Sequence, residues 1–292
     1  MPSSAKHALT RRQFVAASLP VLLMGNAAFA SQQGPRLAVL DWAWAETVLA
    51  LGAEPYAVAE APLYNERVVS PALPATTIDL GLRSWPNMEL LKSLHPGLII
   101  TQAGYGVPES RLETIAPTMA LPLFTEDRTP LALAESGMSA IAERLDRKAE
   151  GDAYIARFDE ALSKMRDTLA GDDGRPVLIV KFAGERLVDI YGRGSLFDDV
   201  LQRLGLENAW QEVGNRWGFS TAGLDAIARH RDARLVIIEP GPPPSLAQSR
   251  LWNTIPSVGA GRVFTIPPTW VFGGLPSALR FGRILTEALT PA

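Results

Sequence analysis

Short apolar runs and longer helical patterns alternate along this chain from residue 36 to its end. The runs have the length of β-strands, and segments such as Ala43–Leu51 between them carry apolar residues at helical spacing. This alternation is typical of α/β layers, in which helices cover a sheet. The sequence therefore predicts an α/β fold. The expected strands are Arg36–Leu40, Thr77–Leu80, Leu98–Gln102, Leu121–Phe124, Pro176–Phe182, Leu187–Ile190, Leu235–Glu239 and Val263–Ile266.

The longest uninterrupted helical pattern, Leu145–Leu169, lies between two groups of expected strands. Its apolar residues recur every three or four positions, which predicts one buried stripe. A helix of this length is about 35 Å long at roughly 1.5 Å per residue. It suits a rigid strut between two lobes, and an ordinary helix of one lobe is the alternative. The stripe consists of Tyr154, Ile155, Phe158, Leu162, Met165 and Leu169.

The position of this helix predicts two α/β lobes joined by one long rigid helix. A mature chain of about 260 residues exceeds one typical domain of about 100–150 residues, and a composition that is 47% apolar can fill two cores. The expected divisions are a signal peptide over residues 1–30, an N-terminal lobe over 31–144, the interlobe helix over 145–170 and a C-terminal lobe over 171–292.

The two halves also echo each other. Leu49–Glu54 resembles Gln202–Glu207, and each segment closes an expected helix before a strand. If the echo reflects a repeated lobe, the loops of Arg83 and Trp217 occupy corresponding places and face each other across a cleft. A shared helix–strand pattern without common structure is the alternative.

The first thirty residues have the three parts of a secretory signal peptide. Lys6, Arg11 and Arg12 are positive, and Phe14–Met24 is shorter than the roughly 20 apolar residues that a membrane span needs. The arginine pair with Phe two residues on is the pattern read by the twin-arginine (Tat) translocon, and an ordinary signal with a chance arginine pair is the alternative. We expect cleavage after Ala30 and a soluble periplasmic protein.

Composition narrows the function of the mature chain. Cysteine is absent, so neither a thiol for a lipid anchor nor a disulfide is available. Removing the signal takes the formal net charge from −3 to −6. An acidic protein is poorly suited to neutralise phosphates, so we expect no nucleic-acid partner.

A catalytic or metal site has little support in the sequence. Only His95 and His230 remain after the signal, and isolated histidines without cysteine cannot form the usual zinc or copper sites. No Gly-x-Ser-x-Gly nucleophile motif is present, and Gly192–Ser195 lacks the third glycine of a dinucleotide fingerprint. We therefore predict no enzyme, no cofactor and no metal held by protein side chains.

Aromatic residues stand beside turn residues at several places. Flanking glycine or proline argues against a core position for Tyr105, Trp217 and Trp270. Aromatic walls with one or two polar donors suit a bulky ligand of mixed polarity. Arg83 is the expected donor, because its planar guanidinium matches clustered oxygens. The residues in question are Trp42, Trp85, Tyr105, Trp217, Phe219, Trp270 and Phe272.

From Arg36 onward the chain resembles the periplasmic ferric-hydroxamate siderophore-binding proteins, the FhuD-like members of the ABC-importer substrate-binding family. Twin-arginine export also occurs in that group. The resemblance is carried by Leu49–Gly52, Ile78–Arg83, Pro86–Leu91, Ala103–Gly106, Ile115–Pro117, Asn208–Gln211 and Trp270.

This resemblance implies two lobes on one long helix, the arrangement called a helical-backbone periplasmic binding protein, with a shallow cleft between them. It implies that Arg83 and Tyr105 hydrogen-bond the hydroxamate oxygens around Fe(III), and that Trp217 and Trp270 wall the cleft. We add Trp42 and Phe272 as ligand-binding residues. The iron is held by its chelator, so the ferric siderophore is the ligand and no cofactor is implied.

Three residues depart from the family pattern. Arg67 falls near a position where tryptophan is common, Phe272 where tyrosine is common, and Thr101 where an aromatic residue occurs. An added cation and a lost hydroxyl favour a more anionic chelate, of the citrate or mixed carboxylate–hydroxamate type. A solvated loop charge is the alternative for Arg67.

The resemblance also implies delivery of the ligand to an inner-membrane ABC permease through one acidic residue per lobe. Glu109 and Asp225 are the candidates, in a monomeric protein. Two other functions stay open: a binding protein for another large chelate, a corrinoid or haem, and an exported siderophore hydrolase.

Overall fold

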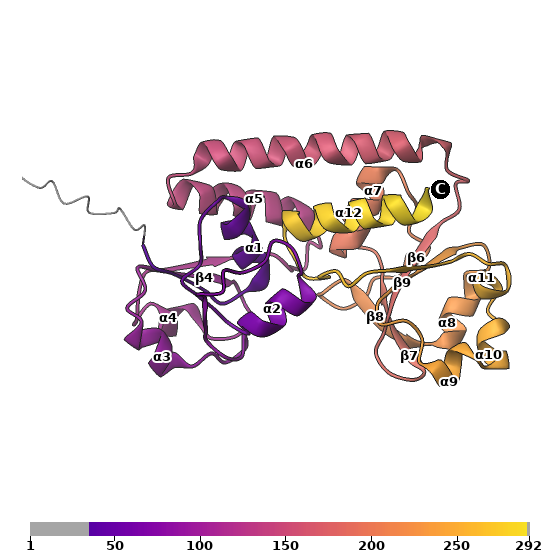
Figure 1. The fold of residues 1–292 in the computed structure, drawn as a ribbon, viewed down its shortest axis with the longest axis horizontal. Coiled ribbons are helices and arrows are strands. Elements are labelled where there is room, and N and C mark those ends of the chain that lie inside the picture. Colours follow the sequence, from indigo (N-terminus) through magenta and orange to yellow (C-terminus); the bar gives the residue numbers. More distant parts are fainter. Residues whose placement is uncertain (1–34, 291–292) are drawn as a thin grey trace, which may run out of the picture. The chain divides into compact units, whose positions relative to one another are not determined.

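A computed structural model describes residues 35–290, which belong to one compact unit. Within it, two five-stranded sheets divide between the halves of the chain (Figure 1). The predicted signal peptide, its twin-arginine motif and cleavage after Ala30 concern residues 1–30, outside the described residues. No helix in the described part of the chain is both long and apolar enough to cross a membrane.

The first sheet is parallel throughout, with the strand order β3-β2-β1-β4-β5. The chain moves outward from β1 to β3, then returns to place β4 on the other side of β1. Ligands of open α/β sheets bind at the carboxyl ends of the strands beside such a reversal. The strands are β1 (Leu37–Val39), β2 (Ala57–Val58), β3 (Ile78–Asp79), β4 (Leu98–Gln102) and β5 (Thr118–Leu121).

The second sheet is mixed, with the order β10-β9-β6-β7-β8. β10, β9 and β6 are parallel, whereas β7 and β8 run antiparallel to their neighbours. The strands are β6 (Val177–Phe182), β7 (Leu187–Tyr191), β8 (Phe219–Gly223), β9 (Arg234–Ile238) and β10 (Val263–Ile266).

The longest described helix, α6 (Lys148–Thr168), connects the two sheets and packs against α5, α7 and α12 (Figure 1). It begins three residues after the predicted start, because Asp146 has a φ of +55° and separates α6 from α5. Phe158 and Leu162 of the predicted stripe are fully buried. The prediction of two α/β lobes on one long helix is confirmed.

The other helices are short, except for two of 15 residues, α5 and α12. α12 is the last element and packs against α1 of the first lobe as well as α7 of the second. The helices are α1 (Trp42–Ala50), α2 (Ala61–Arg67), α3 (Met88–Ser93), α4 (Glu109–Leu112), α5 (Pro130–Arg144), α7 (Leu196–Leu204), α8 (Leu224–Arg229), α9 (Pro244–Ala247), α10 (Arg250–Asn253), α11 (Pro256–Gly259) and α12 (Leu275–Leu289).

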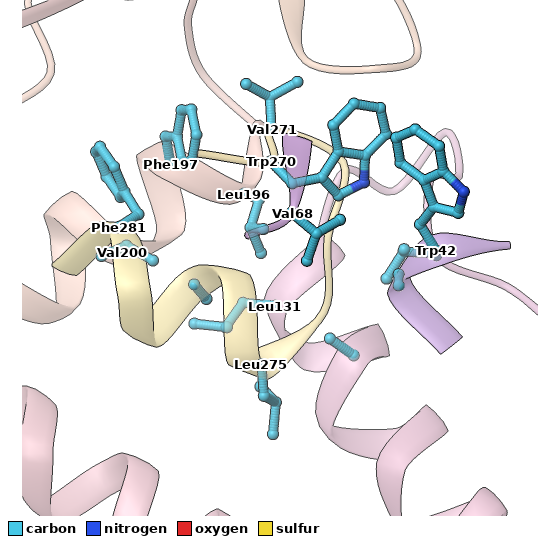
Figure 2. Packing of buried hydrophobic residues seen from close by; sticks show 14 of the residues in the cluster. Trp42, Val68, Leu131, Leu196, Phe197, Val200, Trp270, Val271, Leu275 and Phe281 are labelled. Atoms are coloured by element: carbon cyan, nitrogen blue, oxygen red, sulfur yellow. The ribbon is translucent and has the colours of Figure 1, made fainter. Parts of the chain in front are cut away.

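One hydrophobic core is common to both lobes. It contains Leu37 and Val39 of β1 together with Val177 and Ile179 of β6. Figure 2 shows part of this cluster, where Phe197 of α7 and the α12 residue Phe281 stack with ring centroids 4.0 Å apart. Separate clusters cover the other face of each sheet. The lobes are therefore joined by packed apolar side chains as well as by α6.

Two strand predictions need correction. The strand predicted at Leu121–Phe124 instead occupies Thr118–Leu121, because Pro122 has no N–H to continue the ladder. The apolar residues Leu123 and Phe124, which led to the predicted strand, are instead buried in the shared core. No strand was predicted at Phe219–Gly223, which forms the edge strand β8.

Candidate functional site

A pocket of about 280 Å³ lies where the carboxyl ends of the first sheet approach β8 and the chain before α12. We call it the interlobe pocket. It is lined by Asp41, Arg83, Gln102, Tyr105, Trp217, Phe219 and Phe272. The first four residues come from the first lobe and form its polar wall, and the last three come from the second and form its aromatic wall.

The strand order explains the composition of the polar wall. Asp41 follows β1 and Gln102 ends β4, so the two residues flank the reversal of strand order. Arg83 follows β3. Tyr105 projects from a turn in which Gly104 and Gly106 both have a φ of +71°, a conformation that glycine adopts without strain.

Arg83 is held on three sides. Its Nε donates to Glu60 Oε2 over 2.8 Å. Its guanidinium carbon lies 3.8 Å from the Trp42 ring centroid and 5.0 Å from that of Trp270. Among the described residues, no acceptor takes a hydrogen bond from its Nη atoms. The guanidinium is therefore oriented while its terminal N–H groups stay available to a ligand.

Trp42 and Trp270 support the arginine from behind. Their ring centroids are 4.6 Å apart, and Figure 2 shows the two rings side by side. Both are buried, with 0% and 5% of their surface exposed, and neither lines the pocket. The expectation that Trp270 projects from its loop as a cleft wall therefore needs correction. It belongs to the core because it packs between Trp42 and Phe272.

The aromatic wall is a connected cluster of rings. Trp217 lies 5.8 Å from Phe272, and Phe272 lies 6.0 Å from Phe219. Trp217 also contacts Tyr105 edge to face at 5.7 Å, which joins the two walls at one side of the pocket. Such contacts keep the rings in defined orientations.

Backbone anchors hold the Trp217 loop in place. Asn215 Oδ1 accepts from the Trp217 N–H over 2.9 Å. Gly218 has a φ of +84°, and a Cβ there would lie 2.5 Å from the Ser195 backbone. Only glycine fits this close approach, so Gly218 fixes the backbone that carries the Trp217 ring.

A buried carboxyl group anchors the segment that carries Phe272. Glu46 of α1 accepts hydrogen bonds at Oε1 from the Gly274 N–H over 2.6 Å and at Oε2 from the Ser277 hydroxyl over 2.7 Å. It thereby caps the start of α12, which lies more than 200 residues later in the chain. Burial raises the pKa of Glu46 to about 8, so this tie between the lobes is protonated at neutral pH.

Asp41 supplies the only carboxyl group among the residues that line the pocket. Its Oδ1 caps α1 by accepting from the Ala43 N–H over 2.9 Å. Burial raises its pKa to about 6, against the opposing effect of the Arg83 charge. At neutral pH, which lies above that pKa, Asp41 is mostly ionised and its charge largely offsets that of Arg83.

The pocket brings together four of the seven predicted ligand-binding residues: Arg83, Tyr105, Trp217 and Phe272. The structure does not place Arg67 with them, because this residue is exposed at the end of α2. Burial lowers the pKa of Lys181 on β6, and the Arg67 charge lowers it further. Arg67 therefore acts electrostatically on the second lobe.

The two predicted docking residues are exposed and lie outside the pocket. Glu109 begins α4 in the first lobe. Asp225 lies on α8 in the second, where it pairs with Arg229 over 3.5 Å.

Sequence reasoning missed the roles of Asp41, Glu60 and Gln102 in this site and the pocket-lining position of Phe219. Asp41 and Gln102 stand at the carboxyl ends of strands that the apolar pattern did predict. The rule for open α/β sheets could have found both. Within residues 35–290, no three His, Cys, Asp or Glu side chains are grouped to hold a metal ion.

Comparison with known proteins agrees with this geometry. The family model for periplasmic binding proteins matches residues 37–269. The iron(3+)-hydroxamate-binding protein FhuD of Escherichia coli (strain K12) is 32% identical over 284 residues, which cover 96% of each chain. The Fe(3+)-citrate-binding protein YfmC of Bacillus subtilis (strain 168) is 25% identical over 257 residues, 83% of this chain and 77% of that protein.

A solved structure gives the same fold. The siderophore-binding protein FhuD from Vibrio cholerae, with bound Fe3+–Desferal, matches with a TM-score of 0.83 at 28% identity, over 88% of this chain and 98% of that one. These relatives are binding proteins, which confirms the expectation that the chain is not an enzyme. The match over residues 37–269 and the 32% identity show that the chain belongs to the periplasmic binding protein family.

Proposed function

We propose that this protein binds a ferric siderophore of the hydroxamate or mixed carboxylate–hydroxamate type in the interlobe pocket. The observation that carries the proposal is Arg83, held by Glu60, Trp42 and Trp270 with its terminal N–H groups free, opposite an aromatic wall. The iron(3+)-hydroxamate-binding and Fe3+–Desferal-bound relatives support it.

The chemistry of the ligand fits the two walls. A ferric hydroxamate presents polarised oxygens around a metal that its chelator already saturates. The Arg83 fork and the Tyr105 phenol can donate to those oxygens. The organic arms of the chelate then pack on Trp217, Phe219 and Phe272, and no protein atom needs to ligate the iron.

The positions of the cations support an anionic or mixed chelate. Lys181 pairs with Asp189 of β7, which pairs with Thr221 of β8, two residues after Phe219. Side chains two residues apart on a strand lie on the same face, so Lys181 and Phe219 share one face of the second sheet. Arg67 acts on Lys181 from the first lobe. Neither cation lines the pocket, so both would attract the free carboxylate of a chelate from outside it. The relationship to an Fe(3+)-citrate-binding protein is consistent with this.

We further propose that the protein works in the periplasm as a monomer, after export through the twin-arginine route and cleavage after Ala30. It would then hand the chelate to an inner-membrane ABC permease. Glu109 and Asp225, one exposed acid in each lobe, are the proposed docking residues.

Titration of intrinsic tryptophan fluorescence tests the proposed function. Ferrioxamine B and ferric citrate are added separately to the purified protein, with haem and a corrinoid as comparison ligands. We expect saturable quenching by at least the ferrioxamine, and recovery of the chelate intact by mass spectrometry. Preferential binding of haem or the corrinoid, or recovery of a cleaved siderophore, would overturn the proposal.

A further inference from the structure

Gln102 is a buried side chain in the interlobe pocket whose carboxamide has no partner. Only 3% of the residue is exposed. Its Nε2 is buried without a hydrogen-bond partner among the described residues. An amide removed from water without a partner costs free energy, so such groups in folded proteins call for an explanation.

The position of this amide distinguishes it from other unpartnered groups. Nine buried side-chain atoms lack a partner within residues 35–290, and Gln102 Nε2 is the one that belongs to a pocket-lining residue. Of the other polar residues of this wall, Asp41 caps α1 and Arg83 pairs with Glu60.

The backbone around Gln102 fixes where the side chain can reach. Gln102 is the last residue of β4 and pairs with Leu121 of β5. Its carbonyl accepts from the Tyr105 N–H over 3.4 Å, so the same turn carries both side chains. Both residues line the interlobe pocket, so a ligand that meets the Tyr105 phenol there has the Gln102 side chain in the same wall.

We propose that Gln102 is a further contact of the bound chelate, in which its Nε2 donates to a chelate oxygen that neither Arg83 nor Tyr105 serves. This inference rests on the proposed function. The ligand class it selects is a chelate with a further carbonyl or carboxylate oxygen beside its iron-binding groups. Because the amide is neutral, it strengthens the binding of neutral and anionic chelates by similar factors.

The test uses Gln102→Met, which keeps the length of the side chain but removes both polar atoms. Its dissociation constants for ferrioxamine B and ferric citrate are expected to rise by similar factors of about three to ten, the effect of one hydrogen bond. Its melting temperature without ligand is expected to stay level or rise, because the substitution removes an unpartnered buried group.

Gln202→Met is the matched control. Gln202 lies on α7, and its amide donates to Asp198 Oδ2 over 2.9 Å, outside the pocket. This variant is expected to lose thermal stability and keep both dissociation constants. Gln102→Glu, the second test variant, keeps the shape and adds an acid. It is expected to weaken ferric citrate binding more than ferrioxamine B binding.

Three results would overturn the inference: unchanged dissociation constants in Gln102→Met, a melting temperature lowered as in Gln202→Met, or equal or tighter citrate binding in Gln102→Glu. Each leaves the proposed function standing if the unsubstituted protein binds a ferric chelate. Failure of the unsubstituted protein to bind any ferric chelate would instead remove the proposed function, and the inference with it.

Discussion

The two walls of the interlobe pocket differ in chemistry because the two sheets differ in topology. The first sheet is all parallel, so the carboxyl ends of β1, β3 and β4 lie along one edge and bring Asp41, Arg83 and Gln102 to it. The second sheet is mixed, and it presents the start of the antiparallel edge strand β8 and the segment before α12. Those segments supply aromatic rings.

The walls also differ in how their side chains are held. Arg83 is oriented by an ion pair and two indole rings, whereas the aromatic wall is held by ring contacts, by the close backbone approach at Gly218 and by the Glu46 side chain. This division suggests that the first lobe decides which oxygens are recognised, and the second supplies apolar contact area. Five predictions test how the two walls are built and held.

Glu46 ties α1 of the first lobe to the start of α12, so its loss should have the largest effect. Glu46→Ala leaves the Gly274 N–H and the Ser277 hydroxyl buried without their acceptor. We expect the free energy of unfolding to fall by about 2–4 kcal/mol. Urea denaturation measures it, and a change below about 0.5 kcal/mol would show that the tie is dispensable.

The same carboxyl predicts a dependence on pH. The pKa of Glu46 is raised from 4.5 to about 8 in the folded protein, so the folded state holds a proton that the unfolded state has lost. The stability from this group is therefore complete below pH 4.5 and is lost as the pH rises through about 8. Glu46→Gln cannot titrate.

Melting temperatures of Glu46→Gln and the unsubstituted protein, measured from pH 4.5 to 8, check this prediction. The difference should grow with pH in favour of the variant. The raised pKa of Asp41 likewise removes stability as the pH rises from 3.8 to about 6. Asp41 is present in both proteins, so its contribution cancels from the difference between their melting temperatures. Parallel curves would contradict the raised pKa.

Arg83→Ala tests the polar wall. We expect ferric-hydroxamate binding to weaken by about 1.5–3 kcal/mol, the range for a hydrogen bond to a charged group. Isothermal titration calorimetry gives the value, with Arg203→Ala as the control because that arginine forms exposed ion pairs on α7. An unchanged dissociation constant would remove Arg83 from the site.

Trp217→Ala tests the aromatic wall. Loss of this partly buried ring should weaken binding by about 1–2 kcal/mol, somewhat below the value for a fully buried large side chain. The loss should be similar for neutral and anionic chelates, since the wall carries no charge. Trp85→Ala is the matched control, because Trp85 is 59% exposed and lies outside the pocket. A loss confined to anionic chelates would break the contrast between the walls.

Glu60→Gln should have the smallest effect. The amide oxygen can still accept from Arg83 Nε, but the charge that partly neutralises the arginine is gone. Binding of ferric citrate should strengthen by about 0.5–1 kcal/mol relative to ferrioxamine B. Glu66→Gln, an exposed acid on α2, serves as the control. Equal changes for both chelates would mean that Glu60 does not tune the charge of the polar wall.

Local sequence patterns were enough for the α/β class, the long helix and most strands. Leu98–Gln102 and Val263–Ile266 were predicted with the bounds that the structure shows. Apolar runs and helical spacing are properties of neighbouring residues, so they can be detected without knowing the fold. Local patterns also singled out Arg83 and Tyr105, to which the family resemblance added a role, and both line one pocket.

Tertiary structure alone decided which distant residues meet. No local pattern pairs Glu60 with Arg83, joins Glu46 to Ser277, or turns Trp42 and Trp270 into supports for an arginine. Nor could a pattern show that the Gln102 amide lacks a partner. These contacts depend on the order of strands in each sheet and on the core shared by both lobes. Side chains far apart in the chain become neighbours only when those elements pack.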